Sequence, residues 1–386
     1  MKVLYDSQAF DMQTHGGVSR CFAELYSHMP KDVDAQIAVV ETNNVYLQNL
    51  GFKKPGDTYQ TFMNGSRSKW RRMKYKLHYN FMYGRYRQWD RMPNLNLLEQ
   101  ERLLREQDYD VFHPTFFGDA NLALIGEKPF VVTVHDMIPE IYTKYYQAND
   151  PQILQKKAII PKATHLVAVS EQTKKDLMRI MNIPEQKITV VYHGADESPY
   201  IPSADSPYDF EYILYVGERH FYKNFIFFCR DCMPILKRHK NLKVICTGVP
   251  FTWEENYFIA VFGMEDRFIQ TFVQSDQEFM DLYHHAVAFV YPSEYEGFGI
   301  PILEAYKADC PVMLNRRSCF PEIAGDAAVY FNLDAYESDF EEQFETLYHL
   351  DGNEREALLV KQRERLKRYS WTKSAQQLAD VYRKLA

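Results

Sequence analysis

Two carboxylates, Glu296 and Glu304, stand eight positions apart in SEYEGFGIPILEA, residues 293–305. The run just before them, AVAFVYPS at residues 286–293, is apolar and rich in β-branched and aromatic residues, which predicts a buried strand. The two glycines of the Gly-Phe-Gly stretch permit a tight turn, and Pro301 suits the first turn of a following helix. The pattern therefore predicts a strand, a glycine loop and a helix, with one carboxylate in the loop and the other in the helix.

A ligand with an anion at its centre and hydroxyls at both ends would fit this unit. The free N–H groups and the positive dipole end of a helix favour an anion, and ligands of open α/β sheets bind beyond the carboxyl ends of the strands. A carboxylate accepts hydrogen bonds from hydroxyls, so Glu296 and Glu304 could hold the two ends of such a ligand. That chemistry describes a nucleotide sugar. The alternative is that Glu296 is an ordinary turn residue and Glu304 a solvated helix residue.

Cations and a second pair of glycines could serve the same ligand. Arg219 and Lys223, in VGERHFYKN, follow a predicted strand, where they could neutralise a diphosphate and the charge that develops as a glycosidic bond breaks. The alternative is a pair of solvated surface cations. Gly16 and Gly17 precede a predicted helix and can present bare N–H groups to phosphate, although a helix start without a ligand would look the same.

The elements that must position these residues alternate between strands and helices, which is the βαβ pattern of an α/β fold. Residues 197–209 are rich in Pro, Ser and Asp, lack helical periodicity and predict a linker between two α/β halves. A cleft between the halves would be the commonest place for a small-molecule site. The strand candidates are MKVLYDS, AQIAVVE, DVFHPTF, FVVTVHD, HLVAVS and ITVVYHG before the linker, and YILYVGE, KVICTG, FIQTFV and AVAFVYP after it.

Composition narrows the class of protein. A chain of 386 residues with 46% hydrophobic composition can bury sizeable cores, and two domains are expected. A net charge of −7 does not suggest a nucleic-acid binder. No run approaches the roughly 18 apolar residues of a membrane span, and the first ten residues lack the apolar core of a signal peptide, so we expect a cytoplasmic protein. Six scattered cysteines in so long a chain are expected to be reduced thiols.

One stretch departs from the acidic balance. Residues 66–91 hold nine Lys or Arg and one Asp, interleaved with aromatic residues. This composition suits a peripheral contact with the anionic inner face of the cytoplasmic membrane. The alternative is an amphipathic helix whose aromatic residues enter the N-terminal core while its cations are solvated.

The motifs together resemble those of glycosyltransferase family 4. EGFGIPILEA resembles the Glu-x7-Glu signature of that family, and the other pieces fall in the family's order along nearly the whole chain: GGVSR (16–20), VHD (134–136), VAVSEQTKKDL (167–177), VVYHGAD (190–196) and VGERHFYKN (216–224). The resemblance implies the GT-B fold, two Rossmann-like domains facing each other across a cleft. The domains expected from it are an N-terminal acceptor domain at 1–198, a linker at 199–209, a C-terminal donor domain at 210–368 and a C-terminal helix at 369–386 that crosses back to the N-terminal domain.

The resemblance also implies roles for residues. Glu296 would hold the hydroxyls of the donor sugar together with the loop amides, Glu304 would hold the ribose, and Arg219 and Lys223 would bind the leaving nucleoside diphosphate. His135 resembles a cleft histidine that faces the donor sugar; the alternative is a structural histidine at a strand end. The expected catalytic residues are His135, Arg219, Lys223 and Glu296, and the expected donor-binding residues are Gly16, Gly17, Arg219, Lys223, Glu296, Gly297, Phe298, Gly299, Ile300 and Glu304.

The activity implied is retaining transfer of a hexose from a nucleotide sugar to a glycan or lipid-linked glycan, without a protein nucleophile. In this family the leaving diphosphate helps to deprotonate the acceptor on the same face. GGVSR, FHPTF and HDMIPE resemble bacterial mannosyltransferases of surface-polysaccharide synthesis, so GDP-mannose is the first expected donor and a UDP-hexose the second. The alternative functions are a nucleotide-sugar binding protein that has lost transfer and a GT-B epimerase.

No metal cofactor is expected. Asp108 and Asp110, in DYD, mimic the metal-binding Asp-x-Asp of the other main glycosyltransferase fold, but they precede a predicted strand instead of following one. Cys229 and Cys232 form a single Cys-x-x-Cys without a second pair at zinc spacing. The neighbouring histidines of MDLYHHAVAF have no evident ligand partners in the sequence.

Overall fold

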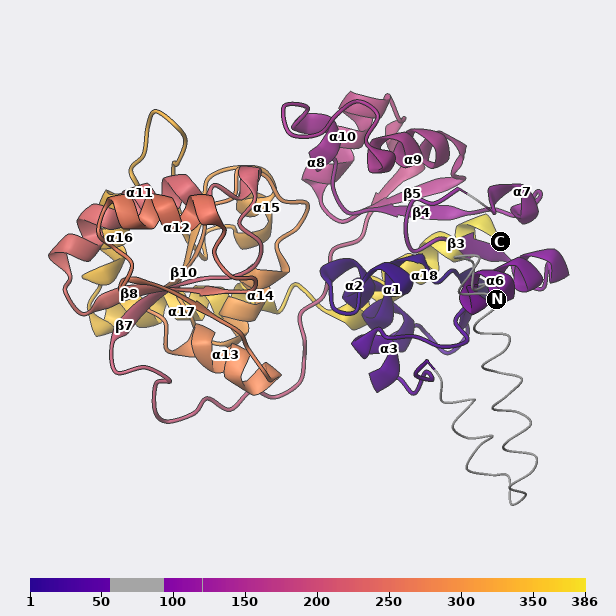
Figure 1. Cartoon of the computed structure of the whole chain (residues 1–386). Helices are drawn as coiled ribbons and strands as arrows, with labels where there is room; N and C mark the ends of the chain where they lie inside the picture. The colour runs from indigo at the N-terminus through magenta and orange to yellow at the C-terminus, as the bar shows by residue number, and fades with distance from the viewer. Residues whose placement is uncertain (56–93, 120) are drawn as a thin grey trace, which may run out of the picture. The chain divides into compact units, whose positions relative to one another are not determined.

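The structure is a computed structural model that describes residues 1–55, 94–119 and 121–386. It divides into two compact units, each an α/β assembly (Figure 1). Unit 1 comprises Met1–Thr133, Leu154–Val167 and Ala375–Ala386. Unit 2 comprises Val134–Ile153 and Ala168–Ser374.

Unit 1 contains a parallel sheet of order β2-β1-β3, in which Val3 lies opposite Ala35 on one side and Val111 on the other. The last helix ends in this unit, where the Tyr382 hydroxyl lies 2.7 Å from that of Tyr5 and 2.5 Å from His113 Nδ1. The strands and helices among its described residues are β1 (Lys2–Tyr5), α1 (Gln8–Met12), α2 (Gly17–Ser27), β2 (Asp34–Ile37), α3 (Val45–Asn49), α6 (Leu95–Glu106), β3 (Val111–His113) and α7 (Leu122–Ile125), together with most of α9 (Pro151–Ile159) and α18 (Trp371–Leu385), whose first residues belong to unit 2.

A second three-stranded sheet has the order β4-β5-β6. Its strands are β4 (Val131–Val134), β5 (His165–Ala168) and β6 (Ile188–Val190), and α8 (Ile138–Ile141) and α10 (Glu171–Met181) follow the first two of them. The side chain of Ser170 caps α10 by accepting a hydrogen bond from the Thr173 N–H, 3.0 Å away.

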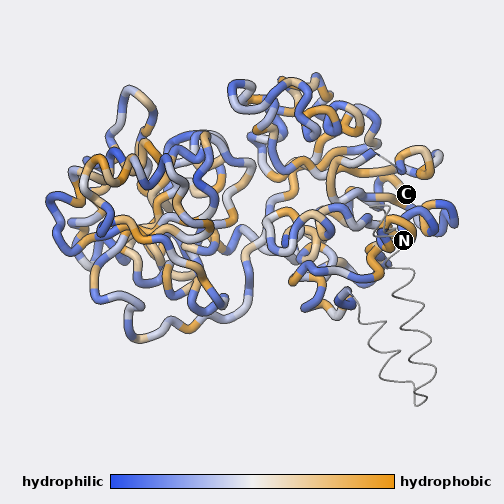
Figure 2. Tube along the Cα trace, viewed as in Figure 1, coloured by the Kyte–Doolittle hydropathy of each residue, from blue (hydrophilic) through white to orange (hydrophobic). Residues whose placement is uncertain are grey.

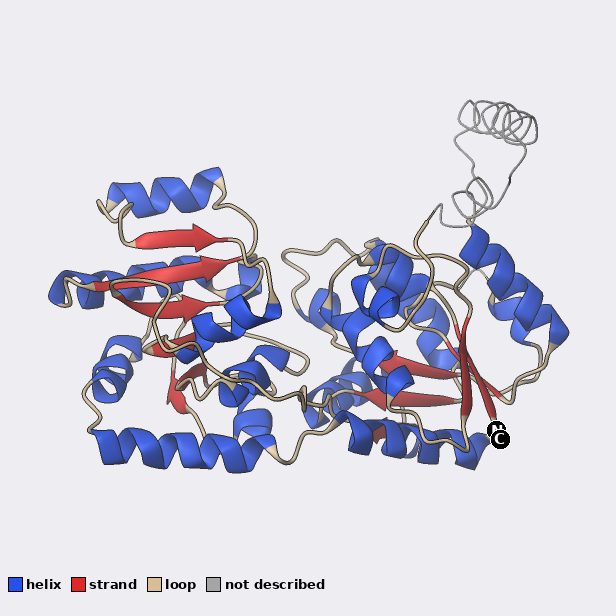
Figure 3. Ribbon diagram, turned by 90° about the horizontal axis from the view of Figure 1, so that it is seen from below, coloured by secondary structure: helices blue, strands red, loops and turns tan. Residues whose placement is uncertain are grey.

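Unit 2 contains a six-stranded sheet of order β12-β11-β10-β7-β8-β9, and its strands are parallel (Figure 3). The strands are β7 (Glu211–Tyr215), β8 (Leu242–Thr247), β9 (Phe268–Thr271), β10 (Ala288–Tyr291), β11 (Val312–Asn315) and β12 (Val329–Phe331). The helices between and after them are α11 (Phe225–Arg238), α12 (Trp253–Val261), α13 (Asp276–His284), α14 (Ile300–Lys307), α15 (Phe320–Ala324), α16 (Phe340–Tyr348) and α17 (Gly352–Leu366).

Alternating side chains of this sheet enter two different cores. In β7, Tyr212 and Leu214 belong to one buried cluster, whereas Ile213 and Tyr215 belong to the other. Both faces of the sheet are covered, so its strands read as nearly continuous hydrophobic runs (Figure 2).

The order of strands fixes where a ligand can bind. The chain runs outward from β7 through β8 to β9, and then returns to the other side of β7 as β10 before continuing to β11 and β12. Ligands of open α/β sheets bind beyond the carboxyl ends of the strands where the order reverses. That point lies between β7 and β10, where the loops at residues 216–224 and 292–299 emerge.

Every strand candidate named from the sequence contains a strand, although β2 and β6 end earlier than their hydrophobic runs suggest. The sequence reasoning missed β11 and β12. Residues 197–209, all of which the structure describes, contain no helix or strand. All six cysteines are buried and free, as expected of reduced thiols. Among the described residues, no helix is both long and apolar enough to cross a bilayer.

Candidate functional site

Glu296 and Lys223 form a close ion pair at the point where the strand order reverses. Lys223 Nζ lies 2.6 Å from Glu296 Oε1, and the two side chains are only 15% and 10% exposed. The hydroxyl of Ser293 donates a second hydrogen bond to the same carboxylate oxygen, at 2.7 Å. Two expected site residues that are 73 positions apart in the sequence are thus in direct contact.

The surroundings of this pair favour its charges. Lys223 Nζ lies 5.2 Å from the centre of the Tyr222 ring and 5.8 Å from that of Tyr291, distances at which aromatic rings attract cations. Burial raises the pKa of the Tyr291 hydroxyl, and the neighbouring Glu296 carboxylate raises it further. Tyr291 is therefore neutral at physiological pH and adds no negative charge to the site.

The backbone of Glu296 is hydrogen-bonded to the loop that follows the neighbouring strand, β11. Ser318, in the loop after β11, donates from its hydroxyl to the Glu296 carbonyl at 2.7 Å and accepts from the Glu296 N–H at 3.3 Å. Ser318 has a φ of +51°, in the left-handed region that residues with a side chain rarely adopt. The carboxyl ends of β10 and β11 are adjacent, which is what allows one hydroxyl to hold the Glu296 backbone in place.

Both glycines of the loop are needed where they stand. A Cβ at Gly297 would lie 1.7 Å from the carbonyl oxygen of His135, and Gly299 has a φ of +99° at the N-cap of α14. Phe298, between them, is buried in the core. Ile300 begins α14 and Pro301 stands in its first turn, as the sequence pattern predicts.

Glu304 lies in α14 and is half-buried. The Tyr283 hydroxyl donates to its Oε2 at 3.2 Å, and Tyr283 itself is fully buried in α13. The glutamate of the helix is thus held from a neighbouring helix, whereas Glu296 is held by its own loop and by Lys223.

Arg219 is buried, and one of its guanidinium nitrogens has no hydrogen-bond acceptor among the described residues. Its Nε donates to Glu255 Oε1 at 3.0 Å, and its Nη2 donates to the carbonyls of Val249 and Pro250 at 2.6 and 2.9 Å. Its Nη1 is also buried, and within the described part of the chain no atom accepts a hydrogen bond from it. Two phenylalanine rings lie beside the guanidinium, with centres 4.9 and 5.4 Å from its central carbon.

The expected histidine lies beside a second one. The rings of His135 and His193 are stacked, with centres 5.7 Å apart. Burial lowers the pKa of His193, and the proximity of His135 lowers it further, so His193 is neutral at physiological pH. The sequence motif VVYHGAD contains His193 but gave no reason to single it out.

Gly16 and Gly17 are in unit 1, at the start of α2. Gln13 occupies part of this helix start, because its side-chain oxygen accepts a hydrogen bond from the Ser19 N–H at 3.0 Å. A Cβ at Gly17 would meet no atom within 4 Å. The N–H of Ser19 is therefore already satisfied by the chain itself.

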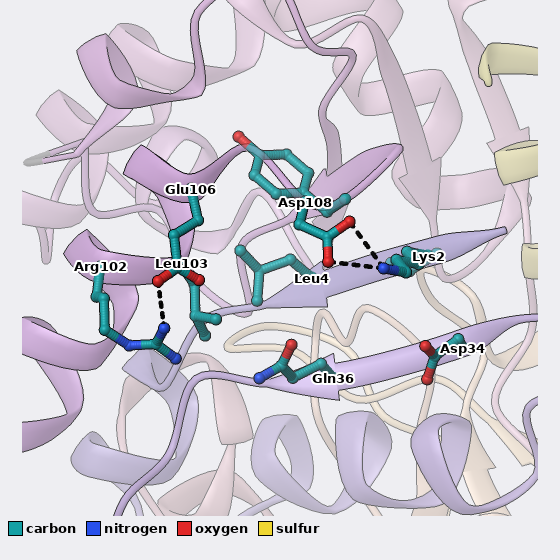
Figure 4. A pocket seen from close by; sticks show the side chains of 10 residues that line it. Lys2, Leu4, Asp34, Gln36, Arg102, Leu103, Glu106 and Asp108 are labelled. Atoms are coloured by element: carbon teal, nitrogen blue, oxygen red, sulfur yellow. Dashed lines mark hydrogen bonds and ion pairs between the residues drawn. The ribbon is translucent and has the colours of Figure 1, made fainter.

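The residues considered for metal binding make other contacts. Lys2 Nζ lies 2.6 Å from Asp108 Oδ2, and the backbone N–H of Lys2 donates to Asp110 at 2.8 Å, so both carboxylates secure the start of β1. Asp108 and Lys2 line a polar cavity of about 310 Å³ together with Asp34, Arg102 and Glu106 (Figure 4). Lys2 is paired with Asp108 and Arg102 with Glu106, so these two cations of the cavity are already neutralised.

Cysteine and histidine candidates are likewise structural. Cys229 and Cys232 are buried in α11, and burial raises the pKa of both thiols. His284 Nδ1 lies 2.9 Å from the carbonyl of Ala308, and His285 Nε2 lies 3.0 Å from that of Ser203. The basic stretch at residues 66–91 lies outside the described residues.

Besides His193, sequence reasoning missed three residues that hold the side chain or backbone of a site residue. Ser293 stands inside the quoted motif, three positions before Glu296, and could have been noticed. Ser318 and Glu255 are 22 and 36 positions away from the residues that they hold, and no spacing pattern marks them.

A parallel sheet that carries its charged residues at the strand-order reversal defines a class of nucleotide- and phosphate-binding α/β proteins. Solved structures specify the fold. A glycosyltransferase from Rickettsia africae matches with a TM-score of 0.67 at 16% identity, covering 100% of this chain and 98% of that one. Anabaena HepE in complex with UDP and glucose matches with a TM-score of 0.70 at 14% identity, covering 100% of both chains. The fold is GT-B, with two Rossmann-like domains.

Family models specify the chain further. The model of Glycosyltransferase Family 4 matches residues 15–198, and that of Glycosyl transferases group 1 matches residues 198–370. The chain belongs to glycosyltransferase family 4, a family of enzymes.

Curated relatives are distant. The O-antigen chain mannosyltransferase RfbU of Salmonella typhimurium is 27% identical over 227 residues, which are 55% of this chain and 63% of RfbU. The O-antigen chain mannosyltransferase B of Escherichia coli is 25% identical over 296 residues, which are 72% of this chain and 75% of that protein.

Proposed function

We propose that this protein transfers a hexose, with retention of configuration, from a nucleotide sugar to a hydroxyl of a glycan or lipid-linked glycan. The observation that carries the proposal is the grouping of Arg219, Lys223 and Glu296 on the loops where the strand order reverses. It is supported by membership of glycosyltransferase family 4 and by HepE, whose solved complex contains UDP and glucose.

The diphosphate would bind to the two cations. Arg219 Nη1 is a buried donor without a partner among the described residues, and a phosphate oxygen would satisfy it. Lys223 would move its hydrogen bond from Glu296 to the diphosphate. The N–H groups of Gly299 and Ile300, at the start of α14, would add an uncharged anion site.

The sugar and the ribose would bind to the two glutamates. Once Lys223 turns to phosphate, the Glu296 carboxylate is available to accept hydrogen bonds from sugar hydroxyls. Glu304, held by Tyr283, would accept from the ribose hydroxyls. His135 would face the sugar next to Gly297, and Gly16 and Gly17 would approach the phosphate.

Catalysis would then rest on electrostatics. As the bond between the sugar and the diphosphate breaks, negative charge grows on the leaving phosphate, where the fixed guanidinium of Arg219 and the ammonium of Lys223 would stabilise it. The leaving phosphate would accept the acceptor's proton on the same face of the sugar. This differs from retaining glycosidases, which use a carboxylate nucleophile, and we assign no nucleophile here.

The donor that we propose first is GDP-mannose, with a UDP-hexose as the alternative. Two of the matched relatives, RfbU and the E. coli enzyme, are mannosyltransferases of O-antigen chains, which favours mannose. HepE in complex with UDP and glucose favours the alternative. The reaction is proposed to need no metal.

We also propose the domain boundaries and the membrane contact read from the sequence. The two family models meet at residue 198, which supports an N-terminal domain at 1–198, a linker at 199–209 and a donor domain at 210–368. The contact of Tyr382 with Tyr5 supports a return of the helix at 369–386 to the N-terminal domain. The composition of residues 66–91 supports a peripheral site on an anionic membrane.

Hydrolysis and transfer of a panel of nucleotide sugars test the proposal. GDP-mannose should be consumed faster than UDP-glucose or UDP-galactose, and Arg219→Ala should lower turnover by on the order of 10² to 10³. Consumption of a UDP-hexose instead would select the alternative donor. Tight binding of all donors without transfer to any glycan would favour a binding protein, and interconversion of epimers would favour an epimerase.

A further inference from the structure

Glu255 holds Arg219 by a buried ion pair. The side chains of Arg219 and Glu255 are 2% and 8% exposed, and Arg219 Nε lies 3.0 Å from Glu255 Oε1. The two residues come from different loops of the sheet: Arg219 follows β7, whereas Glu255 stands in the first turn of α12, after β8. An ion pair so well shielded from solvent holds both side chains in place, because separating them would leave a buried charge uncompensated.

The second oxygen of Glu255 is anchored to the backbone. Glu255 Oε2 accepts a hydrogen bond from the Thr252 N–H at 2.7 Å, and the Thr252 hydroxyl accepts one from the Glu255 N–H at 3.2 Å. This reciprocal pair is a capping box at the start of α12. One carboxylate therefore joins the rigid start of a helix to the guanidinium of Arg219.

The remaining contacts of Arg219 leave one nitrogen unused. The carbonyls of Val249 and Pro250 accept from its Nη2, so Nε and Nη2 are both committed to the protein. Nη1 is the nitrogen that, among the described residues, has no acceptor although it is buried. A guanidinium presents its five N–H groups in a fixed plane, so fixing two of its nitrogens also fixes the direction of the third.

We propose that Glu255 is a positioning residue for the transfer reaction, which aims Arg219 Nη1 at the leaving diphosphate. The inference rests on the proposed function of Arg219. Glu255 touches neither donor nor acceptor in this scheme and acts only through the guanidinium. Because the ion pair cancels the net charge of Arg219, this arginine supplies a directed hydrogen bond more than a free positive charge, and Lys223 supplies the charge.

Two variants separate this role from the role of Glu255 as a helix cap. Thr252→Ala removes the hydroxyl from the capping box and leaves the carboxylate on Arg219, so it is the matched control. Glu255→Gln keeps the size of the side chain but loses the charge, and its amide can accept from only one of the two donors. Glu255→Ala removes both interactions.

Turnover, donor KM and thermal unfolding should be measured for each variant with the same donor and acceptor. We expect kcat to fall about tenfold in Glu255→Gln and on the order of 10²-fold in Glu255→Ala, with little change in the KM for the acceptor. Thr252→Ala should lose less thermal stability than Glu255→Gln, because it weakens only the capping box and leaves the buried ion pair intact, and it should keep kcat within about twofold. An equal loss of kcat in Thr252→Ala and Glu255→Gln would reduce Glu255 to a helix cap and overturn the inference.

A double-variant cycle makes the test independent of folding. If Glu255 acts through Arg219, Glu255→Gln should cause no further loss of kcat when it is introduced into Arg219→Ala. If the double variant instead loses kcat by the product of the two single-variant factors, the inference is overturned. If Arg219→Ala alone transfers at the wild-type rate, the proposed role of Arg219 fails and the role of Glu255 fails with it. If Arg219→Ala is slow and Glu255→Gln is normal, only the inference about Glu255 fails.

Discussion

Replacing Glu296 by Gln should strengthen binding of a nucleoside diphosphate while weakening sugar transfer. Glu296 Oε1 lies 2.6 Å from Lys223 Nζ, and both side chains are largely buried. A diphosphate that uses Lys223 must compete with this carboxylate. The amide of Gln keeps the shape of the side chain but removes the competing charge.

The size of the effect follows from the strength of the contact. A hydrogen bond to a charged group contributes about 1.5–3 kcal/mol, and an amide oxygen can still accept a weaker one. If about 1.4 kcal/mol of the competition is removed, the Kd for the diphosphate falls about tenfold. Transfer should fall by on the order of 10²-fold, because the sugar hydroxyls lose a charged acceptor.

Titration calorimetry with GDP, UDP and intact nucleotide sugars measures both sides of this prediction. Ser293→Ala is the matched control, since it removes the other hydrogen bond to Glu296 Oε1, 2.7 Å long, and keeps the carboxylate charge. It should leave diphosphate affinity within about twofold of the wild type. Diphosphate binding that is unchanged or weaker in Glu296→Gln would refute the competition and remove Lys223 from the diphosphate site.

The remaining predictions concern the nucleotide, the metal, the membrane and the linker. Glu304→Ala should weaken the free nucleoside diphosphate by about tenfold, a loss typical of one charge-assisted hydrogen bond, and calorimetry that finds normal affinity would contradict the ribose assignment. EDTA should leave transfer largely intact, whereas a loss that Mn²⁺ or Mg²⁺ restores would reopen a metal role for Asp108 and Asp110. The protein should bind anionic vesicles at low salt and dissociate from them as the salt concentration rises from 0.01 to 0.1 M, because the Debye length then shrinks from about 30 Å to about 10 Å. Vesicle sedimentation should show weaker binding when four cations of residues 66–91 are replaced by Gln: Arg71, Arg72, Lys74 and Lys76. Burial opposes ionisation of Asp281, but hydrogen bonds from Ser203 and Tyr200 outweigh it and lower its pKa to about 2. The stability that these bonds add should be present above the ordinary Asp pKa near 4 and should disappear as the pH falls towards 2, so unfolding of wild type and Asp281→Asn should differ at pH 7 and converge in acid.

The strands around the site could be predicted because each is a short apolar run bounded by turn residues. The run AVAFVYPS corresponds to β10, and the glycine loop and α14 follow it as the pattern indicates. β12, Val329–Phe331, escaped notice because it is only three residues long, two of them only partly buried, and forms the edge of the sheet. β11, Val312–Asn315, is fully buried but begins soon after α14 ends at Lys307, so the sequence pattern does not separate its short apolar run from the helix.

The contact between Lys223 and Glu296 could be anticipated only in part. Each residue follows a strand, and the carboxyl ends of parallel strands meet at one edge of a sheet, so the sequence places both residues at that edge. It does not say which strands are neighbours. β7 and β10 pair with each other although β8 and β9 stand between them in the chain, and this pairing brings Lys223 to Glu296.

The groups that orient the site are harder to read than the groups that form it. Glu255 looks from the sequence like any glutamate in the first turn of a helix, where an acidic residue is common for reasons of capping alone. Its contact with Arg219 depends on β7 and β8 being neighbours and on α12 beginning just beyond the Val249 and Pro250 carbonyls that accept from the same guanidinium. Each of these conditions is satisfied only after the sheet has formed. If the sheet did not fix them, Arg219 would reach the same region as a mobile cation. Under the proposed function, the rate of transfer would then depend on Arg219 alone. A dependence on Glu255 would therefore measure how much electrostatic stabilisation the protein provides before the donor binds.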